Sequence, residues 1–203
     1  MSADIILVVC TANICRSPFA ELLLKAGLHA DLNAVVESAG THAHEGMVVC
    51  ARVEEHLTTD EWVAQARGKV SRAVTPELLE SAALILTASR EQQSELVRLN
   101  PSVRDRTHTL REAAHRGSQF RPGPKRESRG RVREYAAHLD RARLTAEPLS
   151  MPRHAWAPWA RPADPASIGD GHNGGTRGHV RTLQEVVTAT ETIVAQLNRG
   201  PIS

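Results

Sequence analysis

The sequence predicts an α/β fold, a three-layer sandwich in which helices cover both faces of a central parallel sheet. Short apolar runs rich in isoleucine, valine and leucine recur along the first 110 residues, with amphipathic segments between them. An apolar stripe at helical spacing closes the chain. Strands that alternate with helices in this way favour a parallel sheet buried on both sides.

The first strand and the first helix follow each other closely. Residues 4–9 form a short apolar run bounded by polar residues, as in a fully buried strand. After a polar stretch, Pro18 stands where the first residue of a helix is expected, because proline is tolerated at that position. Apolar residues then recur at helical spacing, namely Phe19, Leu22, Leu23 and Ala26.

The same alternation continues along the chain. Residues 34–37, Ala82–Thr87 and 107–110 are predicted as strands, which makes four in all. Helices are predicted over residues 48–57 and Arg90–Leu99. The final helix has one apolar stripe, formed by Leu183, Val186, Val187, Ile193, Val194 and Leu197.

The composition changes after about residue 114, where arginine, proline, glycine and histidine become frequent. Residues 134–144 are predicted as a helix, and residues 119–130 and 147–165 as loops. We interpret residues 1–203 as one domain with an insertion at about 114–165. The first loop carries four basic residues, Arg121, Lys125, Arg126 and Arg129. It is either a solvated loop or a segment that steers an anionic substrate.

Composition and charge exclude several classes of function. The chain is 41% hydrophobic, enough for a core, and its formal net charge is only +2. The basic residues form no repeated stripe, so nucleic acid is not an expected partner. Without a run approaching about 18 apolar residues, and without a signal peptide, we expect a cytoplasmic protein that does not bind membranes. Three cysteines are too few for a disulfide framework.

The chemistry is concentrated in residues 9–18, which read Val-Cys-Thr-Ala-Asn-Ile-Cys-Arg-Ser-Pro. Cys10 stands where a buried strand ends, and Arg16 stands where a helix begins. A loop in this position can curl with its backbone N–H groups pointing inward, which makes a binding site for an anion. The helix N-terminus and the guanidinium also favour the thiolate form of Cys10, which is the nucleophilic form.

Arg16 has two roles in this hypothesis. Its planar guanidinium can hold two phosphoryl oxygens at once, which positions phosphorus over sulfur and stabilises charge in the transition state. Ser17 can donate a hydrogen bond to the thiolate, and Asn13 can hold the curled loop in shape. The pattern therefore predicts a phosphate-binding loop with Cys10 as nucleophile.

Residues 9–18 resemble the signature of the low-molecular-weight protein tyrosine phosphatases in identity, order and place in the chain. Residues 37–41, Glu-Ser-Ala-Gly-Thr, and residues 106–112, Arg-Thr-His-Thr-Leu-Arg-Glu, are similar to further segments of that family. The resemblance covers about residues 4–113 and the C-terminal helix. It implies a four-stranded parallel sheet, a phosphate-binding loop after the first strand, and a phosphocysteine intermediate that is hydrolysed without metal or cofactor.

The resemblance also implies the substrate and the residues that bind it. The partner is a phosphorylated protein or a small phosphate ester. The residues that bind its phosphate are Arg16 with Thr11, Ala12, Asn13, Ile14, Cys15 and Ser17. Eukaryotic members frame a phenyl phosphate with aromatic residues, whereas this chain offers His42, His44 and His172 in those places. Trp156 and Trp159 either supply an aromatic wall or anchor their loop.

The mechanism also needs an acid that protonates the leaving oxygen and then, as a base, activates water. The family resemblance implies an aspartate from a late loop. Asp164-Pro165 reproduces the family's Asp-Pro dipeptide, but Asp170 lies at the better distance from the final helix. We therefore favour Asp170 as the acid, with Gly171 in the place of the family's proline.

The remaining cysteines and histidines allow further interpretations. The resemblance implies that Cys15 forms a reversible disulfide with Cys10 under oxidation, and the alternative is simple packing. Cys50 is interpreted as a packing residue or a plain surface thiol. His42 and His44 have no further ligands at a recognisable spacing, so no metal site is predicted.

Two other functions remain open at this point. An arsenate reductase has the same fold and the same Cys-to-Arg loop, which binds arsenate as a phosphate mimic. Thioredoxin-linked relatives carry a cysteine pair after the third strand, whereas this chain has no cysteine after Cys50. The second alternative is a phosphate-binding module that has lost its acid. Measured turnover distinguishes such a module from an enzyme.

Overall fold

The computed structural model describes residues 3–123, 130–150 and 164–200. Its centre is a sheet of four parallel strands in the order β2-β1-β3-β4. The strands are β1 (Asp4–Cys10), β2 (Ala34–Gly40), β3 (Ala82–Thr87) and β4 (Thr107–Thr109). The predicted α/β class with a four-stranded parallel sheet is confirmed.

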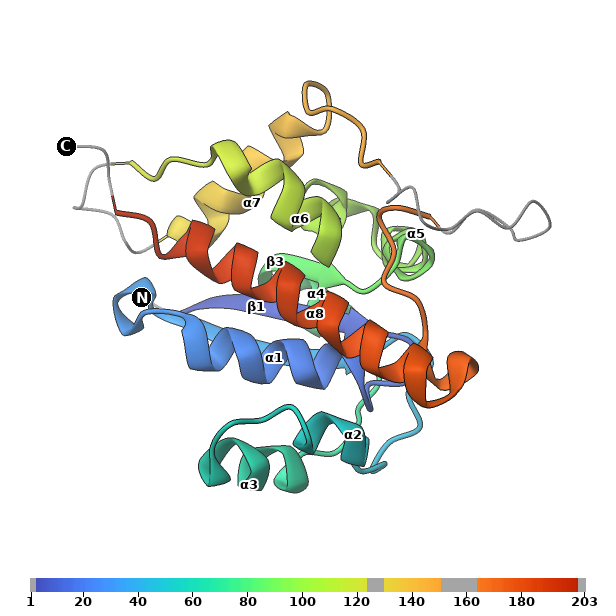
Figure 1. The fold of residues 1–203 in the computed structure, drawn as a ribbon. Helices are drawn as coiled ribbons and strands as arrows, with labels where there is room; N and C mark the ends of the chain where they lie inside the picture. Colours follow the sequence, from blue (N-terminus) through green and yellow to red (C-terminus); the bar gives the residue numbers. More distant parts are fainter. Residues whose placement is uncertain (1–2, 124–129, 151–163, 201–203) are drawn as a thin grey trace.

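Helices cover both faces of this sheet (Figure 1). Side chains of β1 alternate, so that Ile6 and Val8 join one hydrophobic cluster while Leu7 and Val9 join another. The first face packs against α1 (Arg16–Gly27), α6 (Leu110–Arg116), α7 (Arg131–Ala142) and α8 (Gly175–Leu197). The second face packs against α4 (Pro76–Ser81), α5 (Arg90–Leu99) and the 3-10 helix η2 (Pro101–Arg106).

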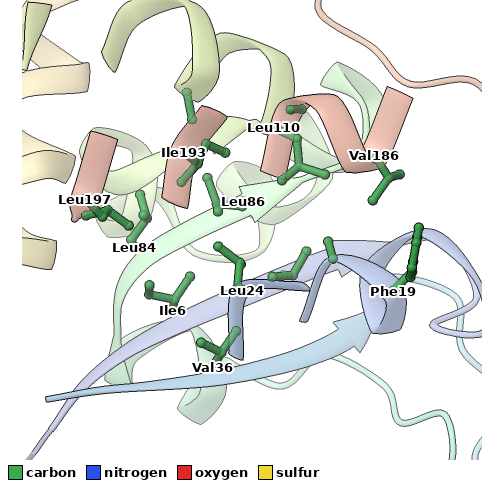
Figure 2. Close-up of a cluster of buried hydrophobic side chains, with 14 of the residues drawn as sticks. Ile6, Phe19, Leu24, Val36, Leu84, Leu86, Leu110, Val186, Ile193 and Leu197 are labelled. Atoms are coloured by element: carbon green, nitrogen blue, oxygen red, sulfur yellow. The ribbon is translucent and has the colours of Figure 1, made fainter. Parts of the chain in front are cut away.

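The larger cluster fixes α1 and α8 on the sheet. Figure 2 shows Ile6 and Leu84 of the strands facing Leu24 of α1 and Ile193 of α8. All four side chains are fully buried. Burial of one such side chain contributes about 1.5–3 kcal/mol, so several together hold the two helices firmly. This packing sets the N-terminus of α1 at the edge of the sheet where β1 ends.

The predicted apolar stripe of the last helix is confirmed. Leu183, Val186, Ile193 and Leu197 of α8 are buried, and Val187 and Val194 pack partly buried against the same cluster. Within the three described ranges, no helix is both long enough and apolar enough to cross a bilayer.

The prediction of a helix over residues 48–57 is wrong for most of its length. The helix in this region, α2, covers only Ala51–Glu54. Val48 forms an isolated β-bridge, and the N–H of Cys50 donates to the carbonyl of Ile14 at 2.7 Å. The segment before α2 is therefore extended because its backbone makes tertiary contacts, which override local helix propensity.

Two helices differ from the sequence analysis in other ways. Helix α3 (Asp60–Gly68) was not predicted, although the side chain of Thr59 caps its N-terminus. The helix predicted over residues 134–144 is α7, which begins earlier, at Arg131, because Gly130 with φ of 95° is its N-cap.

The first helix begins at Arg16, so the prediction of Pro18 as its first residue is wrong. Pro18 is the third residue of α1 instead. Its missing N–H costs no hydrogen bond there, because the first four N–H groups of a helix have no intrahelical acceptor. The earlier start brings the guanidinium of Arg16 onto the first turn of the helix.

His108 of β4 is fully buried, and its ring nitrogen Nε2 lies 3.2 Å from the carbonyl oxygen of Asp105. Burial, together with the charges of Arg143 and Arg116, lowers the pKa of this imidazole from 6.5 to about 3. Between these two values the unfolded chain binds a proton that the native protein does not bind. The stability of the native state therefore falls as the pH falls through this range.

We expect His108→Asn to remove this part of the pH dependence. One such group contributes a slope of about 1.4 kcal/mol per pH unit to the free energy of unfolding. Urea unfolding of both proteins between about pH 6.5 and 4 measures it. The difference between the free energies of unfolding, wild type minus variant, should decrease by about 1.4 kcal/mol for each pH unit below 6.5. A difference that is independent of pH would contradict the prediction.

Candidate active site

Cys10 lies at the carboxyl end of β1, between the ends of β2 and β3. The parallel register pairs Cys10 with Gly40 of β2, so β2 continues beyond the predicted residues 34–37. On the other side, Val9 pairs with Thr87 of β3. Because the sheet order is β2-β1-β3-β4, the end of β1 is the switch point where open α/β sheets bind ligands. The loop after Cys10 therefore lies where this fold class places its sites.

The loop between β1 and α1 turns on Asn13, whose φ of 55° is in the left-handed region. Its amide Nδ2 donates to the hydroxyls of Ser17 at 2.9 Å and Ser38 at 2.8 Å. Its Oδ1 accepts the backbone N–H of Arg72 at 3.0 Å. The buried Asn13 side chain thus joins the loop to α1 and β2, which is the shaping role expected from the sequence.

The end of β2 contacts the same loop directly. A Cβ atom at Gly40 would lie 2.5 Å from the carbonyl oxygen of Thr11, so only glycine permits this close approach. The N–H of Thr41 donates to the carbonyl of Cys10 at 3.0 Å, and that of His42 donates to the carbonyl of Thr11 at 2.8 Å. The first half of the loop is therefore held against β2.

The sulfur of Cys10 lies 3.0 Å from the hydroxyl oxygen of Ser17. Asn13 donates to the same oxygen, which leaves the hydroxyl proton of Ser17 free to point at the sulfur. The other acceptor in reach, the carbonyl of Ala39, is farther away at 3.4 Å. The Ser17 hydroxyl is therefore placed to donate a hydrogen bond to the sulfur of Cys10.

Arg16 presents its guanidinium beside the loop, with the side chain only 7% exposed. Its Nη1 donates to the carbonyl of Ile168 at 3.1 Å, and its Nη2 donates to Oδ2 of Asp170 at 3.1 Å. The N-cap residue of α1, Cys15, makes no side-chain capping bond. The positive end of the helix dipole and the guanidinium therefore act together on any anion in the loop.

Asp170 is the candidate acid that the structure brings to the loop. One carboxylate oxygen contacts Arg16, and the other accepts the N–H of His172 at 3.0 Å. The carboxylate is 38% exposed, so water and a substrate can reach it. The carbonyl of Gly169 accepts the hydroxyl of Thr182 at 3.2 Å, which ties this segment to α8.

Asp164 has a different environment. Its carboxylate accepts the N–H of Ala166 at 3.1 Å and the hydroxyl of Ser167 at 2.7 Å, as in a capped turn. It also forms an ion pair with Arg90, with an N–O distance of 3.6 Å. These contacts hold the turn, and the Asp-Pro dipeptide does not bring Asp164 to Arg16.

Cys15 belongs to the same loop, but its thiol differs from that of Cys10. Burial raises the pKa of Cys15 from 9.0 to about 12, and the sulfurs of Cys50 and Cys10 act in the same direction. Its Sγ lies 3.2 Å from Nε2 of His179 on α8. A thiol with this pKa is protonated at neutral pH, so Cys15 is not a candidate nucleophile.

Several residues that contact the loop were not predicted. They include Ser38 and Arg72, which bond to Asn13, and Gln92 of α5, whose Nε2 donates to the hydroxyl of Thr11 at 3.0 Å. Ser38 had a usable signal, because a serine in the middle of a buried strand needs a partner. Arg72 and Gln92 had none, since their distance from the loop along the chain is long.

The histidines that the sequence placed around the substrate site lie in two different environments. His42 is exposed, with its Nδ1 3.8 Å from a carboxylate oxygen of Glu95. His172 instead packs edge-to-face against His179, with ring centroids 4.6 Å apart. Trp156 and Trp159 lie outside the described residues.

The basic loop is described only in part. Arg121 donates to the carbonyls of Ser118 at 3.4 Å and Phe120 at 2.9 Å, so this arginine makes local contacts. The other three basic residues, Lys125, Arg126 and Arg129, lie outside the described ranges.

A model of the low molecular weight phosphotyrosine protein phosphatases matches residues 5–143 of this chain. The chain belongs to this family. The match includes the loop around Cys10 and Arg16, and the chain is accordingly a cysteine-dependent phosphatase, a hydrolase of phosphate monoesters. The matched residues end before Asp170, so the match does not identify the general acid.

Relatives of the phosphatase carry names from two substrate classes. A protein-arginine-phosphatase of Bacillus subtilis is 35% identical over 113 residues, which are 53% of this chain and 70% of the relative. A probable low molecular weight protein-tyrosine-phosphatase of Erwinia amylovora, AmsI, is 35% identical over 102 residues, 50% and 67% of the two chains.

Solved structures share the fold of the phosphatase over nearly its whole length. A low molecular weight protein tyrosine phosphatase from T. tengcongensis has a TM-score of 0.61 at 18% identity, covering 95% of this chain and 99% of its own. The YwlE arginine phosphatase from Geobacillus stearothermophilus has a TM-score of 0.59 at 20% identity, covering 96% and 92%. At these identities the likeness shows the fold alone.

Proposed function

We propose that the phosphatase uses Cys10 as nucleophile, Arg16 as phosphate-binding residue, and Asp170 as general acid and then general base. The 3.1 Å contact between Arg16 and Asp170 carries this proposal. It places a carboxyl group, partly exposed to water, beside the guanidinium that faces the loop. Nucleophile, anion-binding group and proton donor then lie around one position for phosphorus.

In the first step the phosphate binds to the N–H groups of residues 11–17 and to Arg16. The phosphate dianion and the carboxylate of Asp170 compete for the same guanidinium N–H, so substrate binding frees Asp170 to take up a proton. The Cys10 thiolate then attacks phosphorus, and the bond from phosphorus to the leaving oxygen breaks. Asp170 gives its proton to that oxygen, so the product leaves as a neutral alcohol or phenol.

In the second step Asp170 is a carboxylate and accepts a proton from water. The water oxygen attacks phosphorus, the bond between phosphorus and sulfur breaks, and inorganic phosphate leaves. The electron pair returns to Cys10 as a thiolate, which the hydroxyl of Ser17 stabilises from 3.0 Å.

We propose that the substrate is a phosphotyrosine protein or a related phosphate ester. We also propose that the enzyme acts in the cytoplasm. The relatives named protein-tyrosine-phosphatases support this class, and the relative named protein-arginine-phosphatase makes a phosphorylated arginine the comparison to test. The three thiols of Cys10, Cys15 and Cys50 are free, as a reducing compartment would keep them. Matched peptides with either phosphorylated residue, compared by kcat/KM, decide between the two side chains.

We expect Asp170→Asn to lower kcat by about 10²–10⁴-fold on phenyl phosphate, because phenol needs a proton to leave. The loss in kcat/KM, which reports the first step, should be smaller on p-nitrophenyl phosphate, whose leaving group needs little protonation. Asp164→Asn is the matched control, since it changes the same side chain in the same loop region, and it should leave kcat nearly unchanged. Steady-state rates with reductant and EDTA present measure all three proteins.

The reverse ranking of the two variants would make Asp164 the acid and overturn the assignment. Absence of phosphate release from either ester by the wild type would contradict the proposed function as a whole. Arsenate reduction, or phosphate binding without turnover, would then be the functions to measure.

A further inference from the structure

Cys15, Cys50, His172 and His179 come together behind the phosphate-binding loop. One ligand atom from each of the four lies within 4.8 Å of the other three. They come from three segments, because Cys15 precedes α1, Cys50 precedes α2, and the two histidines flank the start of α8. The fold therefore assembles this cluster from parts of the chain that are far apart in sequence.

The spacing of the cluster fits tetrahedral coordination. A tetrahedral zinc ion, with bonds of about 2.3 Å to sulfur and 2.0 Å to nitrogen, holds its ligand atoms about 3.3–3.8 Å apart. Nε2 of His179 lies 3.2 Å from Sγ of Cys15 and 3.6 Å from Sγ of Cys50. Small side-chain rotations bring the other pairs from at most 4.8 Å into this range.

The backbone already holds the two cysteines in position. The N–H of Cys50 donates to the carbonyl of Ile14 at 2.7 Å, which fixes the start of α2 against the residue next to Cys15. Neither cysteine side chain caps the helix that follows it. Both sulfurs are therefore turned toward the histidines rather than toward the backbone of their own helices.

We infer that Cys15, Cys50, His172 and His179 form a binding site for one zinc ion. Two thiolates and two imidazoles are a common set of zinc ligands, whereas calcium and magnesium require oxygen ligands. Binding breaks the two S–H bonds and releases two protons to solvent, and the resulting thiolates balance the charge of Zn²⁺. Four protein ligands close the coordination sphere, so the ion is structural and takes no part in phosphoryl transfer.

The position of the site gives the ion a role in arranging the active site. His172 is two residues from Asp170, and its backbone N–H donates to the Asp170 carboxylate at 3.0 Å. Cys15 is the residue before Arg16. A bound ion would thus connect the acid-bearing segment with the phosphate-binding loop, which are otherwise joined by the contacts of Arg16 with Ile168 and Asp170.

Cobalt binding to the reduced, metal-free full-length protein tests this inference. Co²⁺ replaces zinc in tetrahedral sites, and thiolate ligands give it an intense charge-transfer absorption. We expect one equivalent of Co²⁺ to bind, and one equivalent of Zn²⁺ to displace it. Cys50→Ser should lower the thiolate absorption per bound ion to about half, because one of two thiolates is lost.

Two variants test the ligand set without disturbing the core. His172 is exposed and Cys50 is only partly buried, so His172→Ala and Cys50→Ser should remain folded, as circular dichroism will show. Loss of a residue that only hydrogen-bonds to a metal ligand weakens metal binding by about 10–100-fold. Each of these variants loses a ligand itself and should weaken zinc binding by more than that. The matched controls are Cys10→Ser and the double variant His42→Ala with His44→Ala, which should bind one equivalent normally.

A lack of stoichiometric binding would overturn the inference, as would thiolate absorption per bound ion that is undiminished in Cys50→Ser, or a zinc affinity that is unchanged in His172→Ala. A Cys15–Cys50 disulfide in the purified protein, seen by mass spectrometry even when reductant is present during purification, would overturn it as well. The readout is metal binding and not turnover, so these outcomes leave the proposed phosphatase mechanism untouched.

Discussion

Cys10→Ser is expected to abolish turnover, with kcat/KM falling by at least about 10⁴-fold, as happens when a catalytic nucleophile is removed. The oxygen of serine fits in the place of a sulfur that already lies 3.0 Å from the Ser17 hydroxyl. A serine hydroxyl remains protonated at neutral pH, however, and among the described residues the side chain bonded to Cys10 is the hydroxyl of Ser17, which is not a base. The variant should therefore keep the binding site and lose the chemistry.

Phosphate release from p-nitrophenyl phosphate and equilibrium binding of inorganic phosphate, measured on the same preparation, separate these two properties. Cys50→Ser, assayed with EDTA present beside metal-free wild type, is the matched control and should match the turnover of that wild type, because its sulfur lies near His179. Substantial hydrolysis by Cys10→Ser would exclude Cys10 as the nucleophile.

Arg16→Met is expected to lower kcat by about 10³–10⁵-fold, the range known for arginines that stabilise a transferring phosphoryl group. The side chain is buried and donates to both Ile168 and Asp170, so its loss removes the charge that faces phosphate and releases the acid as well. Methionine has a similar unbranched shape and no charge, which keeps the change in packing small.

Arg16→Lys separates charge from geometry. It keeps one positive charge but cannot hold two phosphoryl oxygens in a plane, so we expect its kcat to lie between those of wild type and Arg16→Met. Initial rates over a range of substrate concentrations give kcat and KM separately. A loss confined to KM in both variants would show that Arg16 binds substrate without stabilising the transition state.

The fold was predictable from the sequence wherever the pattern was strongly periodic. Residues 82–87 and 90–99 form the predicted strand and helix with the same ends, because a buried apolar run and a capped amphipathic helix are both local signals. The helix predicted over residues 48–57 was wrong because Val48 and Cys50 contribute to tertiary contacts that no local pattern reveals.

The site divides in the same way. Cys10, Asn13, Arg16 and Ser17 were predictable because they lie in one short loop, where spacing along the chain limits spacing in space. The contacts of Arg72 and Gln92 with this loop depend on how distant segments pack, so the sequence contains no sign of them. The sequence left two candidates for the acid, and the contact with Arg16 favours Asp170.

The candidate zinc site could not be predicted from spacing along the chain. In the sequence, His42 and His44 were the pair to consider for metal binding because they lie close together in the chain. The structure instead gathers Cys15, Cys50, His172 and His179, which span most of the chain. The packing of α8 beside α1, together with the bond from the N–H of Cys50 to the carbonyl of Ile14, brings these side chains together.

Trapping the covalent intermediate is the most direct test of Cys10 as the nucleophile. Asp170→Asn should still form the intermediate from p-nitrophenyl phosphate, whose leaving group needs little acid, but should hydrolyse it slowly because the base is missing. Rapid acid quench followed by peptide mass spectrometry, with fragmentation to distinguish Cys10 from Cys15, locates the phosphoryl group. The account predicts one phosphoryl group on the sulfur of Cys10, absent from the double variant that also carries Cys10→Ser. A phosphoryl group on Cys15 or on a histidine, or turnover without any covalent intermediate, would contradict it.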